Sequence, residues 1–170
     1  MRAKKLSTLI ILLFTAAFAS ATTRLVPAQY PNIQAAMDDC NDGDTVIVAP
    51  GTYTGPGNRE IDFKGKAITV TSTDPNDPNT VAATVIDCQN AGGGFFFHSY
   101  ETSSSALAGL TITNGQQTSW PGPPGGAIRC YGSGTHPLVV NCAITGNSAC
   151  MGGGVYLPQQ RYNTRWLHHK

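Results

Sequence analysis

One stretch, residues 125–157, constrains the fold more than any other part of the chain. It opens with the sequence GGAI and closes with GGGV, and between them lie two short apolar runs separated by asparagine. Ile128 and Val155 occupy equivalent places in these two glycine-rich segments, 27 positions apart. Short apolar runs punctuated by glycine and asparagine are typical of brief strands joined by tight turns.

The same kind of spacing occurs once more upstream. The segment GLTITNG, which begins at Gly109, resembles NCAITGN, which begins at Asn141. Ile112 and Ile144 are equivalent positions in these two segments and are separated by 32 positions. A repeat of 27 to 32 residues made of strands and turns predicts stacked coils rather than a closed globule. Asn114, Asn141 and Asn147 then fall at turns, where we expect them to hydrogen-bond backbone groups between neighbouring coils.

The first 21 residues are predicted to be a secretory signal peptide. They begin with basic residues and continue with an apolar run, residues 6–18, that is too short for a comfortable membrane span. Ala19, Ser20 and Ala21 fit the small-x-small cleavage pattern, so the mature chain is expected to start near Thr22. We therefore expect a secreted or outer-surface protein, and an uncleaved N-terminal anchor is the alternative.

Charge is placed unevenly along the chain. The formal net charge of the whole sequence is +1, but residues 22–157 hold five basic and ten acidic residues, a balance of −5. An acidic body without a basic stripe argues against nucleic acid as a partner, because phosphates need neutralisation. Polyanionic glycans would also be repelled unless calcium bridged them.

Five cysteines are present, an odd number with no spacing that matches a zinc site. They are Cys40, Cys88, Cys130, Cys142 and Cys150. We expect most of them to pack as small apolar residues inside the coils. A disulfide between Cys142 and Cys150 is the alternative, because an exported chain can hold one.

One helix is predicted near the start of the mature chain. Ile33, Ala36, Met37 and Cys40 follow the i, i+3, i+4, i+7 pattern of a single apolar face, so we expect a helix over residues 31–40. No second helix is expected. Short strands are predicted over residues 22–28, 45–49, 52–54, 60–63, 67–72, 84–88, 94–98, 107–113, 127–131, 138–144 and 154–157.

These segments resemble known proteins. The sequence IQAAMDDCNDGDTVIVAPGTYTG, residues 33–55, resembles the N-terminal cap and first coil of right-handed parallel β-helix proteins of the pectin-lyase-like superfamily. The pattern GGAI…NCAITGNSA…GGGV resembles the coils of bacterial "right-handed β-helix region" proteins, including repeats akin to polymorphic outer-membrane proteins. The resemblance implies an all-β solenoid whose open end is plugged by the helix over residues 31–40.

The expected organisation follows from the resemblance and the spacing. Residues 22–157 form one right-handed parallel β-helix domain, with an N-terminal cap over residues 28–44 and about four coils over residues 45–157. Residues 158–170 are basic and break the pattern. We interpret them as a truncated or frame-altered end, and a tail that docks on another chain or an anionic surface is the alternative.

Enzymes of this superfamily use clustered aspartates that hold calcium beside a basic residue, paired carboxylates, or two aspartates with an arginine. The sequence offers few counterparts. Asp74 and Asp77 share one loop and form a weak candidate calcium site, with a proline-locked turn as the simpler interpretation. Arg129 alternates with Ile128 and Cys130, so it is expected to point outward, without an aspartate cluster on the same coil.

Other charged residues near strands have structural interpretations. Glu60 and Asp62 are expected to pair at the surface with their neighbours Arg59 and Lys64. His98 follows three phenylalanines and has no carboxylate neighbour in the sequence, so we expect an ordinary histidine at a strand end.

Aromatic residues in loops and near turns suggest contact with sugars. Trp120, in a proline-rich loop, and Tyr131 are the weak candidates for carbohydrate binding.

We therefore expect a secreted or cell-surface β-helix module without a catalytic site, acting in adhesion, glycan contact or surface display. Its partners would be glycans, cell-surface components, or further coils that cover its C-terminal edge. The alternative is the N-terminal fragment of a polysaccharide lyase or glycoside hydrolase acting on uronate-type glycans, with the active-site coils missing. No cofactor is expected apart from the weak calcium candidate, and no membrane span is expected in the mature chain.

Overall fold

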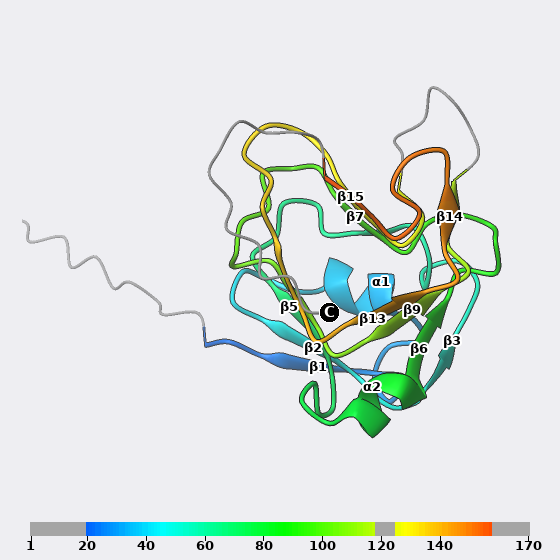
Figure 1. Cartoon of the computed structure of the whole chain (residues 1–170). Coiled ribbons are helices and arrows are strands. Elements are labelled where there is room, and N and C mark those ends of the chain that lie inside the picture. Colours follow the sequence, from blue (N-terminus) through cyan, green and yellow to red (C-terminus); the bar gives the residue numbers. More distant parts are fainter. Residues whose placement is uncertain (1–19, 118–124, 158–170) are drawn as a thin grey trace, which may run out of the picture.

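Parallel strands make up most of the regular structure, together with two short helices (Figure 1). The structure is a computed structural model that describes residues 20–117 and 125–157. The signal-peptide prediction falls almost entirely outside these residues, as does the interpretation of residues 158–170. Among the described residues, no helix has the length and apolar character needed to cross a membrane.

Three parallel sheets and one small strand pair hold the described strands. Sheet A has the order β1 (Thr23–Val26), β2 (Thr45–Val48), β5 (Thr69–Ser72), β8 (Ala106–Ala108) and β12 (Leu138–Val140). Sheet B runs β3 (Gly51–Tyr53), β6 (Thr84–Asp87), β9 (Thr111–Thr113) and β13 (Ala143–Thr145). Sheet C runs β4 (Ile61–Asp62), β7 (Phe95–Phe97), β11 (Ile128–Cys130) and β15 (Val155–Tyr156). Strands β10 (Gln116–Gln117) and β14 (Ser148–Ala149) form the separate pair.

The chain visits the three sheets in turn. From β2 onward it passes from sheet A to sheet B to sheet C and returns to sheet A, and each pass adds one strand to each sheet. Ile112 pairs with Ile144, and Ile128 pairs with Val155, in parallel register. Both spacings seen in the sequence are therefore spacings between strand partners, which confirms the prediction of sequence-distant segments lying side by side.

Alternation along the strands explains where the core lies. In β2 the buried Val46 and Val48 alternate with Thr45 and Ile47, which are partly exposed, as period-two geometry requires. Val46 pairs with Val70, and Val70 pairs with Leu107. These aliphatic side chains therefore stack across the inner face of sheet A, and none of the three residues has exposed surface. β-branched residues suit this pleated, half-buried setting.

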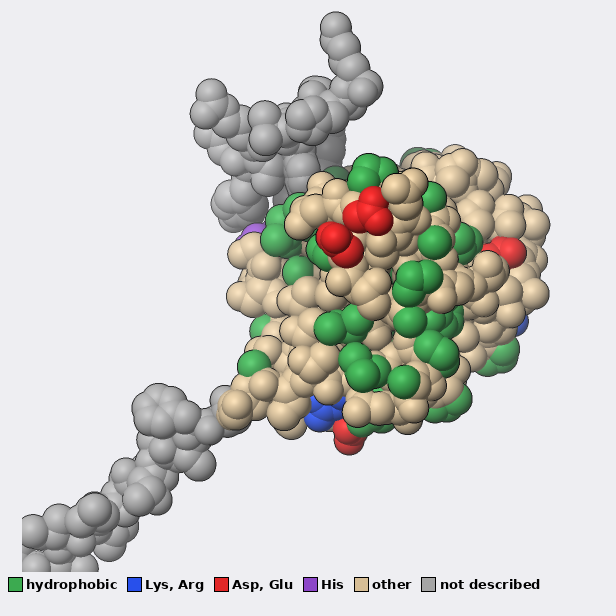
Figure 2. All heavy atoms as spheres, turned by 90° about the horizontal axis from the view of Figure 1, so that it is seen from below, with side chains coloured by type: hydrophobic (Ala, Val, Ile, Leu, Met, Phe, Trp, Pro, Cys, Tyr) green, Lys and Arg blue, Asp and Glu red, His purple; other side chains and the backbone are tan. Residues whose placement is uncertain are grey.

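The outer face of sheet A is largely apolar. Figure 2 views the molecule from below, the side on which β1, β2 and α2 lie in Figure 1, and hydrophobic side chains spread across this face with few charges among them. Leu25, Leu138 and Val140, on the first and last strands of the sheet, are each 37–44 % exposed. Exposed side chains of this kind are common singly on protein surfaces.

Helix α1 (Ile33–Asp38) confirms the predicted helix, over a shorter span. Asn32 caps it by accepting a hydrogen bond from the Ala35 N–H at 2.8 Å, which satisfies one of the free donors of the first turn. Its apolar face buries Ile33, Ala36 and Met37. The helix contacts β1, β2 and β4, and Figure 1 places it at the centre of the view, within the outline of the three sheets.

A second helix, α2 (Pro78–Ala83), corrects the expectation that α1 would be alone. Asp77 is its N-cap and accepts hydrogen bonds from the N–H groups of Asn79 and Thr80, both at 3.1 Å. Pro78 occupies the first turn, where its missing N–H has no partner to lose. The predicted turn is present at residues 75–76, directly before this helix, but the helix itself was not expected.

Two long predicted strands are also corrected, because each is split by a turn into strands of different sheets. Residues 107–113 contribute to β8 and β9, and residues 138–144 contribute to β12 and β13. Gly109 and Asn141 stand at these turns with φ values of 65° and 52°. Such left-handed backbone suits glycine and is tolerated by asparagine, so the chain can bend there from sheet A to sheet B.

The cysteines follow the packing interpretation. All five are free thiols, and Cys40, Cys88 and Cys130 are buried. Burial raises the pKa of Cys88 and of Cys130 to about 12 in each case. Cys142 and Cys150 do not form the disulfide that was the alternative.

Asn147 forms the predicted hydrogen bonds to backbone groups of a neighbouring turn, whereas Asn114 and Asn141 contact side chains instead. Asn147 Oδ1 accepts a hydrogen bond from the Gly115 N–H at 2.7 Å, and its Nδ2 donates to the Ile112 carbonyl at 2.9 Å. Asn114 Nδ2 donates to Asp87 Oδ1 at 2.9 Å. These side chains tie together turns that are 27 to 35 residues apart in the sequence.

Candidate functional site on the outer face of sheet C

Sheet C carries a row of polar and aromatic residues on the side away from the core. Asp62 pairs with Phe96, Phe96 with Arg129, and Arg129 with Tyr156, so one residue of each strand belongs to the row. Their neighbours Ile61, Phe95 and Ile128 face the interior and have no exposed surface. Because alternate residues of a strand point to opposite faces, the four residues of the row project from the outer face.

Arg129 is buried on this face, which corrects the expectation that it projects freely. Its side chain is 3 % exposed, and Nη2 forms an ion pair with Glu60 Oε2. The guanidinium carbon lies 4.8 Å from the centroid of the Phe96 ring, a cation–π arrangement. Arg129 does point away from the core, but the neighbouring strand and Glu60 cover it.

The local pairing predicted for Glu60 is wrong as well. Its second carboxylate oxygen accepts a hydrogen bond from the Gly93 N–H, while Arg59 donates to Gln89 Oε1 at 3.1 Å. Glu60 and Arg129 are 69 positions apart in the sequence. Residues that are far apart in the sequence can thus lie in contact on neighbouring strands. Charged residues that are neighbours along the chain can find their partners elsewhere.

Asp62 and His98 form a second contact across strands. His98 Nε2 lies 3.1 Å from Asp62 Oδ2, so the histidine does have a carboxylate neighbour, 36 positions away in the sequence. The His98 ring stacks on Phe96, with centroids 4.2 Å apart and an angle of 17° between the planes. Lys64, the predicted partner of Asp62, instead directs its amine to Asp38 Oδ1 at 2.7 Å.

Two tyrosines extend the aromatic surface. Tyr131 follows β11 directly and is 45 % exposed, and its ring centroid lies 6.4 Å from that of Tyr156. Tyr131, one of the two predicted carbohydrate contacts, therefore stands on the outer face of sheet C. Trp120, the other predicted contact, lies outside the described residues.

The calcium candidates have local partners. Asp77 Oδ2 accepts hydrogen bonds from the Thr80 N–H and hydroxyl, and the bond from this hydroxyl is the main cause that lowers the pKa of Asp77. Asp74 Oδ1 accepts a hydrogen bond from the Asn76 N–H at 3.0 Å. Within residues 20–117 and 125–157, no three or more histidine, cysteine or acidic side chains are grouped so that they could hold a metal ion.

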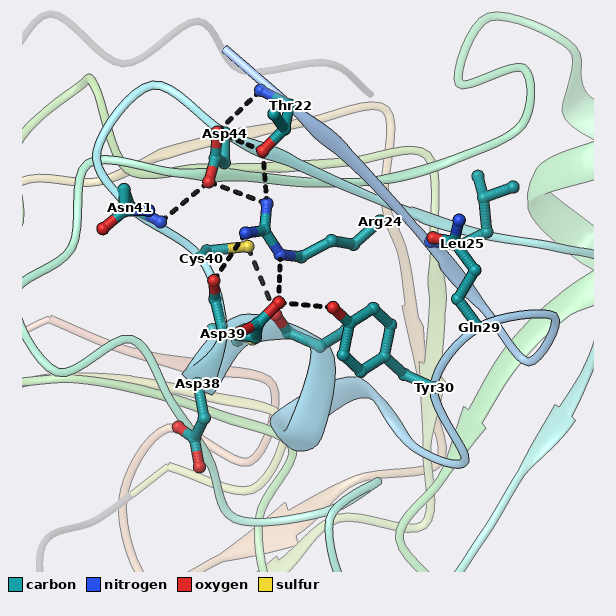
Figure 3. A network of polar contacts seen from close by, with 12 residues as sticks. Thr22, Arg24, Leu25, Gln29, Tyr30, Asp38, Asp39, Cys40, Asn41 and Asp44 are labelled. Carbon is teal, nitrogen blue, oxygen red and sulfur yellow. Dashed lines mark hydrogen bonds and ion pairs between the residues drawn. The ribbon is translucent and has the colours of Figure 1, made fainter. Parts of the chain in front are cut away.

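A separate polar network lies at the N-terminal end of the sheets (Figure 3). Arg24 donates from Nε to Asp39 Oδ2 at 3.0 Å and from Nη1 to Asp44 Oδ2 at 2.7 Å. The Tyr30 hydroxyl donates to Asp39, which raises the pKa of Tyr30 and lowers that of Asp39. A shallow depression of about 490 Å³ lies beside this network, lined by Thr22, Thr23, Arg24, Gln29, Tyr30 and Asp39.

The sequence did not point to this network, because its ion pairs join residues 15 and 20 positions apart and belong to no recognisable motif. Arg24 on β1 contacts Asp39, at the end of α1, and Asp44, directly before β2, so the evident role of the network is to fix β1 in place. Sheet C differs, since its aromatic residues reach solvent next to the polar pairs. No family model, curated protein or solved structure was found to match the chain.

Proposed function

We propose that this chain is a secreted or cell-surface right-handed parallel β-helix, related to the pectin-lyase-like superfamily, that binds a glycan on the outer face of sheet C. Three features support the fold. The chain visits three parallel sheets in a repeating order, the two spacings seen in the sequence are spacings between strand partners, and α1 lies against the first strands. Right-handed crossovers between parallel strands are the strong general rule, which supports that hand here.

The observation that carries the binding proposal is the aromatic surface formed by Tyr131 and Tyr156 next to paired polar groups. The apolar faces of sugar rings stack on aromatic rings, while their hydroxyls need hydrogen-bond partners. Tyr131 and Tyr156 supply the rings, and the polar pair belongs to the same sheet. His98 follows β7, the strand next to β11, and Asp62 is on β4, the strand beyond β7. Sites of this composition, with apolar surface and a few fixed polar groups, are typical of ligand recognition.

Neutral sugars fit this face better than uronates. Residues 22–157 carry a net charge of −5, and two of the acidic residues, Glu60 and Asp62, belong to this face. The charge of Arg129, which could attract a carboxylate, is already matched by Glu60. A polyanionic chain would therefore meet repulsion that no unpaired cation offsets among the described residues of this face.

Binding to soluble neutral and acidic polysaccharides, measured by calorimetry, tests the proposal. The unchanged chain should bind at least one neutral polysaccharide, and Tyr131→Ala should weaken that binding about tenfold, since stacking on one aromatic ring contributes about 1–1.5 kcal/mol. Tyr100→Ala is the matched control, because Tyr100 is 73 % exposed but lies in the turn after β7.

Two results would contradict the proposal. Equal losses from Tyr131→Ala and Tyr100→Ala would mean that exposed aromatic area, rather than the face of sheet C, governs binding. Preference for polyuronates over neutral chains would contradict the charge argument.

One observation favours a second candidate function, a polysaccharide lyase or glycoside hydrolase fragment. The contact between His98 and Asp62 resembles a histidine held by a carboxylate, an arrangement suited to proton transfer. Lyase activity on polyuronate would raise ultraviolet absorbance as new double bonds form. Activity that His98→Ala abolishes would favour this candidate, and its absence at every calcium concentration tried would favour the binding module.

A further inference from the structure

Asp44, at the N-terminal end of the sheets, holds Thr22 through two hydrogen bonds (Figure 3). Asp44 is 3 % exposed. Its Oδ1 accepts hydrogen bonds from the Thr22 backbone N–H at 2.7 Å and from the Thr22 hydroxyl at 2.8 Å. Its Oδ2 accepts from Arg24 Nη1 at 2.7 Å and from the Asn41 N–H at 2.8 Å. A buried carboxylate is thus held against the residue at which the mature chain is expected to begin.

The charges around Asp44 are not balanced by side chains in direct contact. Arg24 is the cation that contacts both carboxylates, Asp39 and Asp44, and Tyr30 binds Asp39 as a neutral hydroxyl. Lys66 is also near, but its amine donates to the carbonyl oxygens of Met37, Asp38 and Cys40. One guanidinium therefore faces two carboxylates, which leaves room for one further positive charge.

Cleavage of the predicted signal peptide would supply that charge. Ala19, Ser20 and Ala21 form the predicted cleavage pattern, so cleavage after Ala21 turns the backbone nitrogen of Thr22 into an α-ammonium group. An ammonium has three donors and a full charge, whereas the uncleaved amide has one donor and no charge. Hydrogen bonds between charged groups are shorter and stronger than neutral ones.

We propose that the N-terminus released by signal cleavage docks on Asp44 and completes the polar network that closes the N-terminal end of the sheets. Asp44 is then the ion-pair partner of the N-terminal ammonium group that cleavage creates. The inference rests on the proposed secretion and goes beyond it, because it couples removal of the signal peptide to the stability of the folded domain. The unprocessed chain folds with the weaker, neutral contact.

Three forms of the chain test the proposal. The first begins at Thr22 with a free amine, the second is the same chain acetylated at that amine, and the third begins at Ser20. At pH 6 the free-amine form should melt a few degrees higher than the other two, which should agree with each other. This gain should disappear as the amine loses its proton, above the ordinary α-amino pKa of about 7.7–8.0.

Variants identify the partner. In the Asp44→Asn background the three forms should melt together, whereas in the Asp39→Asn background the free-amine form should keep its advantage. Equal melting of all three forms without any substitution would overturn the proposal, and this comparison does not depend on whether a variant folds. A free-amine advantage that survives Asp44→Asn would overturn it too.

N-terminal sequencing of the exported protein separates this inference from the proposed secretion. Thr22 as the first residue, together with the melting difference, supports both. Export with a different first residue would overturn the docking while secretion stands, because no ammonium would then lie beside Asp44. Glycan binding is measured independently and is not affected by either result.

Discussion

The two ends of the parallel sheets are built in opposite ways. At the N-terminal end α1 buries Ile33 and Met37, and Arg24 ties β1 to Asp39 and Asp44. At the other end β12, β13 and β15 are the last described strands of their sheets. Here the core-facing Val155 is 41 % exposed, although its strand partner Ile128 is fully buried.

The difference teaches how a parallel sheet protects its interior. A strand buries its core-facing residues only when another strand or a helix lies on each side of it, so a terminal strand needs a cover. Among the described residues, a capping helix and a charged network lie at the N-terminal end of the sheets. Between Glu101 and Leu157 the chain has a single charged residue, Arg129, and it is paired with Glu60.

Thiol labelling should show the largest contrast between the two regions. Cys88 and Cys130 are buried, and with a pKa of about 12 only about one in ten thousand of their thiols is ionised at pH 8. Cys150 is exposed near β14, so it should react with a thiol reagent orders of magnitude faster. Mass spectrometry of peptides after timed labelling measures the rates. Comparable rates at all three cysteines would mean that the middle of the sheets opens as readily as their end.

Matched isoleucines in sheet B give the next largest effect. Ile112 is fully buried, and its strand partner Ile144 is only partly buried. Ile112→Ala should lower the free energy of unfolding by about 2–5 kcal/mol, and Ile144→Ala by about 1 kcal/mol, because the cost follows the buried volume that is lost. Urea unfolding measures both. If the two losses are equal, something covers Ile144 in solution.

The variant Asp44→Asn tests the N-terminal end of the sheets through the pH dependence of the melting temperature. The Thr22 and Asn41 backbone N–H groups are the first causes that hold the pKa of Asp44 well below its ordinary value of about 3.9. A carboxyl whose pKa is lower in the folded chain stabilises the fold at pH values above its pKa in the unfolded chain. This stability is lost as the pH falls toward the pKa in the folded chain. Asp44→Asn should therefore lower the melting temperature by several degrees at pH 6 and by less at pH 3. Asp74→Asn, on an exposed turn, is the control, and a pH-independent loss would contradict the assignment.

The smallest expected effect is at the cap of α1. Asn32→Ala removes the hydrogen bond to the Ala35 N–H and should cost about 1 kcal/mol of stability. Asn32→Asp should retain most of it, since aspartate caps a helix about as well. Urea unfolding of the three proteins measures both changes. Full stability of Asn32→Ala would show that packing of Ile33 and Met37, rather than capping, holds the helix in place.

Much of the fold could be predicted because its signals are local. The period-two alternation in β2, the apolar face of α1, and the spacings that join Ile112 to Ile144 and Ile128 to Val155 are all readable along the chain. The site was less predictable. Tyr131 was identified as an aromatic beside a turn, but the partners of Glu60 and His98 are 69 and 36 residues away.

The sequence by itself determined two of the spacings between strand partners, the parallel strands, the first helix and the burial of most cysteines, because each depends on patterns within a few residues or on the similarity of two short segments. Only the tertiary structure decided which charges meet. Parallel register sets Asp62, Phe96, Arg129 and Tyr156 in one row, and the register of β1 on β2 places Thr22 opposite Asp44. Electrostatic contacts act over a few ångströms in space, so they depend on register between distant segments, which no local pattern specifies.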